Sequence, residues 1–374
     1  MCIRDSHTQM IGKWHLGHLP RYLPTNNGFD SYYGIPYSND MDARRGFPNY
    51  RQTARKDPNY VAPIKQYHVP VIEGTKVVER PANQHTITGR YTDKGVEFIR
   101  ANKDKPFFVY LPHSMPHIPL YVPDEVRDPN PKNAYINTIE HIDSEVGRLL
   151  KVLDDLKLVD NTYVIYTTDN GPWLQFRHHG GSAGPLREGK GTTFEGGQRV
   201  PCVMRGPGIP VGTVCDELTG TIDVLPTIAA LTGKPLPSGR KIDGMDASGL
   251  WQGTAKTSPR KEFLHYTSRG DIEGLRSGNL KLLVTKPRAS RRPNAKQPNN
   301  RPTQIFLFDL SKDLGEQNNL AEAKSDVVKE LRARMEALDA EITKNARQPW
   351  FCLLYTSDGC RRRLRCRSRW SPYH

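Results

Sequence analysis

The sequence predicts an α/β fold, in which a mostly parallel sheet is sandwiched by helices, followed by a smaller α+β domain. Two observations predict this class. Short apolar runs alternate with helical segments up to about residue 240, and the later segments have the spacing of antiparallel strands. A third observation sets the scale, because 374 residues with 36% hydrophobic content suffice for one large core and a satellite core.

The first part of the chain alternates strands and helices. Residues 8–11 are strand-like, and the apolar run 105–111 predicts a buried strand. Residues 134–156 place isoleucine, valine and leucine at helical spacing, which indicates a helix with one apolar face. Residues 162–167 and 200–204 predict two more strands, and 223–231 predict a helix.

The pattern changes after Gly233. Residues 261–266, 273–284 and 304–309 predict antiparallel strands, and a helix is expected from about 321 to 344. We therefore expect a first domain at 7–240 and a C-terminal α+β subdomain at 241–350.

The two ends of the chain differ from the rest. Residues 1–6 are detached from the first strand, and residues 351–374 combine three cysteines and six arginines without a usable period. We expect an artefactual leader and an artefactual tail, and exclude both from the fold prediction.

The formal net charge of +14 is concentrated in two segments. Residues 285–303 hold six basic residues and no acidic one, and the tail holds six arginines against one aspartate. This local excess argues against a nucleic-acid partner for the body of the protein. Residues 285–303 are either a solvated insertion or a weak site for an anionic polysaccharide. A run of about 18 apolar residues is absent, so we predict no membrane span.

Only Cys202 and Cys215 lie in the body of the chain. Without a Cys-x-x-Cys pair, a zinc site is not expected. Two buried free thiols are the default expectation, and a disulfide between them is the alternative in an oxidising compartment.

Four polar segments follow predicted strands, where open α/β sheets place their active sites. Lys13 and His15 lie two residues apart, so on an extended chain both side chains would point to one side and suit an oxyanion. His117 stands in the proline-rich loop 113–119 and suits a general acid, although a structural histidine fits equally well.

The other two segments suggest cation and anion binding. Asp169 and Asn170 offer two hard oxygen ligands for Ca²⁺ or Mg²⁺, although Asp-Asn-Gly is also a common turn. Glycines around Lys190 would let backbone amides and an ammonium group approach an anion together.

Together these motifs resemble the arylsulfatase A-like branch of the type I, formylglycine-dependent sulfatases of the alkaline-phosphatase superfamily. The ordered set is Gly-Lys-Trp-His-Leu-Gly, His-Ser-Met-Pro-His-Ile-Pro, Thr-Asp-Asn-Gly and Gly-Lys-Gly-Thr-Thr-Phe-Glu-Gly-Gly. Segments 29–40, 275–282 and 307–320 also resemble this branch, so the likeness covers roughly residues 7–338.

The resemblance implies a sulfuric ester hydrolase, and residues 7–240 would be its catalytic domain. Lys13 and Lys190 would hold the sulfate oxygens, His15 would bond to the formylglycine, and His117 would assist the leaving oxygen. Asp169 and Asn170 would bind one Ca²⁺, in preference to Mg²⁺. A formylglycine-generating or equivalent maturation enzyme is an implied partner, and the implied location is periplasmic or secreted.

The sequence departs from the family in one major respect. No Cys/Ser-x-Pro-x-Arg motif, the source of formylglycine, occurs in the chain, and the family's N-terminal acidic pair is also absent. We therefore expect an N-terminally truncated sulfatase whose printed chain has no turnover, binds Ca²⁺ poorly and folds badly.

The substrate is less defined than the reaction. Asp40, His178 and His179 are candidate substrate-binding residues, although exposed loop residues fit the same pattern. A sulfated small molecule or sulfated polysaccharide is expected. The alternatives are a phosphate or phosphonate monoester hydrolase of the same superfamily and an inactive relative that binds sulfated glycans.

Overall fold

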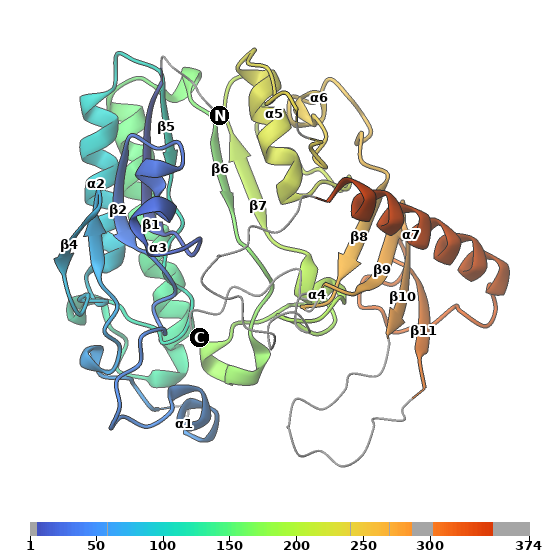
Figure 1. The fold of residues 1–374 in the computed structure, drawn as a ribbon, viewed down its shortest axis with the longest axis horizontal. Coiled ribbons are helices and arrows are strands. Elements are labelled where there is room, and N and C mark those ends of the chain that lie inside the picture. Colours follow the sequence, from blue (N-terminus) through green and yellow to red (C-terminus); the bar gives the residue numbers. More distant parts are fainter. Residues whose placement is uncertain (1–5, 58, 240, 269, 286–301, 347–374) are drawn as a thin grey trace, which may run out of the picture. The chain divides into compact units, whose positions relative to one another are not determined.

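The computed structural model describes residues 6–57, 59–239, 241–268, 270–285 and 302–346 (Figure 1). The expected leader, except Ser6, the tail and most of the basic segment 285–303 lie outside these ranges. The chain divides into two compact units. Unit 1 comprises residues 1–164 and 173–182, and unit 2 comprises 165–172 and 183–374.

Unit 1 is built on a five-stranded sheet with the order β4-β3-β2-β1-β5. The strands are β1 (His7–Lys13), β2 (Ser31–Ile35), β3 (Val71–Glu73), β4 (Lys76–Glu79) and β5 (Phe107–Tyr110). The central strand β1 pairs in parallel with β2 and β5, whereas the β2–β3 and β3–β4 pairs are antiparallel. The sheet is therefore mixed. Its parallel part consists of β2, β1 and β5, and the candidate residues Lys13, His15 and His117 lie at or after the ends of β1 and β5.

Helices cover the parallel strands. Helix α2 (Ile87–Ala101) packs on β1 and β2, and α3 (Ala134–Asp155) packs on α2 (Figure 1). The apolar face predicted for 134–156 contributes Ile142 to a core that includes Ile11, Tyr33 and Tyr91. A short helix, α1 (Tyr50–Lys56), begins at Asn49, whose side chain accepts a hydrogen bond from the Gln52 amide.

The strand predicted at 105–111 forms as β5, but the prediction that it is buried is wrong. Its residues are only partly buried, and Tyr110 is 47% exposed. The reason is its place at the edge of the sheet, which a local apolar run does not reveal.

Unit 2 contains a two-stranded and a four-stranded sheet. The first joins β6 (Val164–Thr167) and β7 (Cys202–Arg205). The short helix α4 (Glu195–Gln198) precedes β7, and the helices α5 (Val224–Leu231) and α6 (Ser248–Trp251) follow it. Cys202 and Cys215 are free, as expected, but exposed rather than buried. The predicted boundary near residue 240 remains a prediction.

The antiparallel sheet of unit 2 has the order β11-β10-β9-β8, which confirms antiparallel strands in the three segments expected from the sequence. The segment 273–284 forms two strands, because the chain turns at residues 278–279. The strands of the sheet are β8 (Glu262–Tyr266), β9 (Ile272–Ser277), β10 (Leu280–Thr285) and β11 (Gln304–Asp309), and helix α7 (Ser325–Asn345) comes after them. One face of this sheet packs against α7. There, Leu275, Leu282 and Leu307 of the strands form a cluster with Leu331 and Met335 of the helix. Because side chains alternate along a strand, Lys281 and Leu283 lie on the opposite face.

Candidate functional site

The carboxyl ends of three parallel strands meet at one edge of the unit 1 sheet. β1 ends at Lys13, whose amide donates to the Pro112 carbonyl, in the segment after β5, at 2.8 Å. The His15 amide donates to the Pro36 carbonyl, directly after β2, at 3.0 Å. The predicted motifs around Lys13, His15 and His117 therefore occupy the edge where parallel sheets hold their active sites.

Gly12 allows this close approach. Its φ is +124°, and a Cβ atom there would lie 2.0 Å from the Pro112 carbonyl oxygen. Only glycine accommodates both conditions. Gly12 thus brings the end of β1 against the segment that leads to His117.

The extended-chain argument for Lys13 and His15 is wrong. The strand ends at Lys13, and His15 has a φ of 59°, in the left-handed region. The two-residue alternation of side chains stops where the strand stops, so the spacing does not set their directions. Lys13 is partly buried and His15 is exposed.

His117 is surrounded by hydrogen-bonding groups. Its Nδ1 lies 3.1 Å from Oδ1 of Asn39, 2.8 Å from the Ile118 carbonyl oxygen and 3.3 Å from Oγ of Ser38. Two of these atoms only accept hydrogen bonds, which assigns a proton to Nδ1 by the network. Nε2 is therefore the nitrogen that exchanges a proton with a ligand.

Asp40 lies beside this histidine. Its side chain is 4% exposed, its Oδ2 accepts a hydrogen bond from Arg51 at 2.7 Å, and its Oδ1 is 4.0 Å from Nδ1 of His117. Burial alone would raise the pKa of Asp40, but the charge of His117 and the bond from Arg51 outweigh it and lower the pKa. Asp40, predicted to bind substrate, is thus an ionised group directed at His117.

The two histidines of the 174–179 segment differ in exposure. His178 is exposed, whereas His179 is 6% exposed and its Nδ1 lies 3.3 Å from the Tyr50 hydroxyl. Tyr50 is itself in the unit 1 core. His178 is therefore open to a ligand, whereas His179 is packed against α1.

In unit 2, the turn that holds Asp169 and Asn170 is hydrogen-bonded to the loop that holds Lys190. The Lys190 amide donates to the Pro172 carbonyl at 2.8 Å, and the Gly171 amide donates to the Gly197 carbonyl at 3.3 Å. These bonds tie the Asp-Asn-Gly-Pro turn after β6 to both ends of the Lys190 loop, residues 189–197.

The contact between turn and loop is tight. A Cβ atom on Gly171 would lie 1.8 Å from the Gly196 carbonyl oxygen, and one on Gly196 would lie 2.3 Å from the Glu188 carbonyl oxygen. The glycines recognised in the sequence thus let two backbones touch.

The donor chemistry of the turn fits a hard cation. Asp169 and Asn170 supply carboxylate and amide oxygens, the ligands that Ca²⁺ prefers, but Ca²⁺ takes six or more. Within the described ranges, no group of three or more His, Cys, Asp or Glu side chains is placed to hold a metal ion. The turn therefore fits as part of a calcium shell.

Sequence reasoning missed three residues around His117. Ser38, Asn39 and Arg51 contact His117 or Asp40 in the structure. Ser38 and Asn39 directly precede Asp40 after β2, which was the available signal. Arg51 comes from α1, and no local pattern links it to the site.

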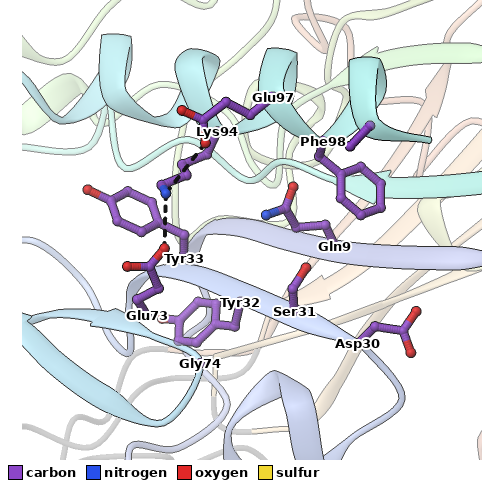
Figure 2. Close-up of a pocket in the computed structure, with 11 residues that line it drawn as sticks. Gln9, Asp30, Ser31, Tyr32, Tyr33, Glu73, Gly74, Lys94, Glu97 and Phe98 are labelled. Carbon is purple, nitrogen blue, oxygen red and sulfur yellow. Dashed lines mark hydrogen bonds and ion pairs between the residues drawn. The ribbon is translucent and has the colours of Figure 1, made fainter. Parts of the chain in front are cut away.

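A cavity of about 350 Å³ lies on the unit 1 sheet, away from all these residues (Figure 2). Gln9, Ser31 and Phe98 line it, and Lys94 spans it with an ion pair to Glu73 at 2.9 Å. None of the candidate site residues lines this cavity. Among the described residues, no helix is long and apolar enough to cross a membrane.

The chain is similar to sulfatases in sequence. The family model described as Sulfatase matches residues 4–234. Arylsulfatase G of Rattus norvegicus is 32% identical over 84% of this chain and 64% of its own length, and arylsulfatase A of Homo sapiens is 33% identical over 90% and 70%. N-acetylgalactosamine-6-sulfatase of Canis lupus familiaris is 36% identical over 64% of this chain and 45% of its own.

Solved structures agree with these relatives. PsFucS1 sulfatase from Pseudoalteromonas sp. has a TM-score of 0.74 and 26% identity, covering 92% of this chain and 72% of its own. Ps i-CgsB, solved in complex with k-i-k-neocarrahexaose, has a TM-score of 0.71 and 26% identity, covering 98% and 77%. The chain spans less than two thirds of the rat arylsulfatase G that it matches. By its family model, its relatives and its fold, the chain belongs to the sulfatase family.

Proposed function

We propose that the protein acts on sulfate monoesters as a sulfuric ester hydrolase, and that Lys190 and the Asp169–Asn170 turn bind the sulfate group. One observation carries the proposal. The Lys190 loop is bonded to that turn through the Lys190 and Gly171 amides, so a residue with a cationic side chain and two residues with hard oxygen ligands belong to backbone segments that touch. An anion and a divalent cation bound together need this combination.

The roles of the unit 1 residues in this proposal come from the resemblance to sulfatases and not from the placement of the two units. Lys13 binds a sulfate oxygen. The resemblance gives His15 the formylglycine as its partner, so His15 is assigned no bond where that group is lacking. His117 donates from Nε2 to the ester oxygen, because its Nδ1 faces acceptors. Asp40, held by Arg51, keeps the imidazole of His117 oriented and favours its charged form. His178 contacts the group that carries the sulfate.

Asp169 and Asn170 are proposed to hold Ca²⁺, or less favourably Mg²⁺. A bound cation would polarise the sulfate oxygens. The two oxygens of the turn provide part of the shell only, so we expect weak binding by the printed chain.

Formylglycine does not fit the residues present. It would arise at the first position of Cys/Ser-x-Pro-x-Arg, and no Cys or Ser of the 374 residues starts that pattern. No step is therefore assigned to it. For the 374 residues of this sequence, we propose binding of sulfate esters without turnover. Hydrolysis requires a polypeptide that carries the motif and has been modified by a formylglycine-generating or equivalent enzyme.

A sulfated sugar is the proposed substrate class. Two similar proteins support it, since one is named N-acetylgalactosamine-6-sulfatase and another was solved with k-i-k-neocarrahexaose. A periplasmic or secreted location is proposed with it, and fractionation of the source cells tests that location.

Isothermal titration of the chain with inorganic sulfate, in the presence of Ca²⁺, tests the site. Lys190→Met should weaken sulfate binding about tenfold or more, because a charge-assisted hydrogen bond contributes about 1.5–3 kcal/mol. The matched control is Lys151→Met, which removes an exposed lysine paired with Asp155 and should leave affinity unchanged.

Parallel titrations separate the two ester classes. Inorganic phosphate and an aryl phosphate should bind more weakly than sulfate and an aryl sulfate. Equal loss in both lysine variants, no sulfate binding by the wild type, or preference for phosphate would each overturn the proposed function.

A further inference from the structure

A fully buried lysine lies in unit 2 at the end of the Lys190 loop. Lys281 of β10 is 0% exposed, and its Nζ lies 2.8 Å from Oε1 of Glu195 and 2.9 Å from Oε1 of Glu316. The two glutamate side chains are 3% and 0% exposed. The mechanism proposed above uses none of these three residues.

A second cation completes the cluster. Arg276 of β9 is the direct cross-strand partner of Lys281, so two like charges stand opposite each other on the sheet. Glu195 lies between them, because its Oε2 is 3.8 Å from Nη1 of Arg276. Two positive and two negative groups therefore share one buried face.

Stability alone does not account for this cluster. Removing charged groups from water costs more than their mutual attraction commonly returns, and packed apolar residues in their place are often as stable. The cost is visible at Glu316, since burial raises the pKa of its carboxyl and Lys281 only partly offsets the rise. In some proteins, however, buried polar or ionic groups fix the register of the elements that they join.

The cluster fixes the Lys190 loop on both sides. Glu195 follows Lys190 by five residues, and its amide donates to Oε2 of Glu316 at 2.7 Å. Ahead of Lys190, Arg187 donates to the Glu316 main-chain carbonyl at 2.7 Å. The Thr193 hydroxyl also donates to Oε2 of Glu273 on β9, at 2.9 Å.

We propose that Lys281, Glu195 and Glu316 are positioning residues, which hold the loop so that Lys190 stays against the Asp169–Asn170 turn. The expected effect on sulfate affinity rests on the proposed function, in which a displaced Lys190 binds sulfate less well. The claim that the loop is held against the turn is independent of the function. It is based on two hydrogen bonds, from the Lys190 amide to the Pro172 carbonyl and from the Gly171 amide to the Gly197 carbonyl.

Hydrogen–deuterium exchange of the ligand-free chain tests whether the loop is held against the turn. Lys281→Met should speed exchange about tenfold in peptides covering 169–173 and 187–199, and Lys281→Arg, which keeps the charge, should restore much of the protection. Because Lys281→Met leaves two buried carboxylates without a cation, a second variant neutralises the cluster: Lys281→Met, Glu195→Gln and Glu316→Gln combined. This variant should fold and still exchange faster at both peptides.

The matched control is Arg260→Met. Arg260 and Asp223 form another buried ion pair of unit 2, with side chains 7% and 2% exposed. The further bonds of these two side chains go to residues 220, 243, 245 and 262 rather than to the loop. This variant should lose comparable stability while the two peptides keep wild-type exchange. Equal acceleration in Arg260→Met, or unchanged exchange in both Lys281→Met and the neutral cluster, overturns the inference.

Titration with inorganic sulfate tests the expected effect on sulfate affinity. The dissociation constant should rise about tenfold in Lys281→Met or, if that variant does not fold, in the neutral cluster, and it should stay at the wild-type value in Arg260→Met. Accelerated exchange with unchanged sulfate affinity overturns the positioning role. If the wild type itself binds no sulfate, the proposed function fails, and the exchange result alone decides whether the cluster holds the loop.

Discussion

At the scale of single residues, Asp40 places a buried carboxylate beside His117. The Oδ1 of Asp40 is 4.0 Å from Nδ1 of His117, and the pKa of Asp40 is lowered, so the carboxylate is ionised at neutral pH. Asp40→Asn should therefore lower the pKa of His117, because a nearby negative charge stabilises the imidazolium. Titration of the His117 ring protons by NMR measures it. Asp42→Asn, which removes a carboxylate bound to Arg80, should not shift His117.

His265 gives a pH dependence at the same scale. Burial, with Lys281 and Arg276 nearby, lowers its pKa from 6.5 to about 3. The unfolded chain then binds the proton first, so stability is lost as pH falls from about 6.5 towards 3. His265→Leu should reduce the loss of unfolding free energy between pH 7 and pH 5 by about 2 kcal/mol. Urea denaturation at both pH values measures it, and a Phe308→Leu control should lower stability equally at both.

At the scale of elements, local pattern predicted strands well and their surroundings poorly. β11 forms at 304–309 as expected, because its apolar run at 305–308 is a property of the strand itself. The exposure of β5 and the left-handed turn at His15 depend on neighbours and chain reversal, which local pattern does not encode. Lys281 and Glu195 are 86 residues apart, so their pairing was not readable either. The grouping of Asp169 and Lys190 was expected from the resemblance.

Two glycine-to-alanine substitutions distinguish a glycine that is required by a close backbone contact from one that only lowers helix propensity. Gly171→Ala should lower the unfolding free energy by about 1–3 kcal/mol, since its methyl group would overlap the Gly196 carbonyl oxygen. Gly147→Ala should raise it by about 0.5–1 kcal/mol, because Gly147 lies inside α3 with nothing within 4 Å of its Cβ position. Urea denaturation measures both. A Gly171→Ala protein as stable as the wild type would contradict the close contact between turn and loop.

At the scale of the whole molecule, the charge of +14 bears on the size of the substrate. The segment 285–303 carries six basic residues without an acidic one, and most of it lies outside the described residues. A small sulfate ester would be bound by the candidate site alone. A sulfated polysaccharide would also meet this segment, because basic stretches attract polyanions over a Debye length of about 10 Å.

Replacing the six basic residues of 285–303 by glutamine tests this difference. Binding to a sulfated polysaccharide, such as chondroitin sulfate, should weaken about tenfold at low salt, and the salt dependence of binding should become shallower because fewer charges are screened. Affinity for inorganic sulfate should stay unchanged, since the candidate site is intact. The matched control replaces the six arginines of 351–374, a comparable charge in a segment expected to be foreign to the fold. If both variants lose polysaccharide binding equally, net charge rather than this segment recruits the polymer.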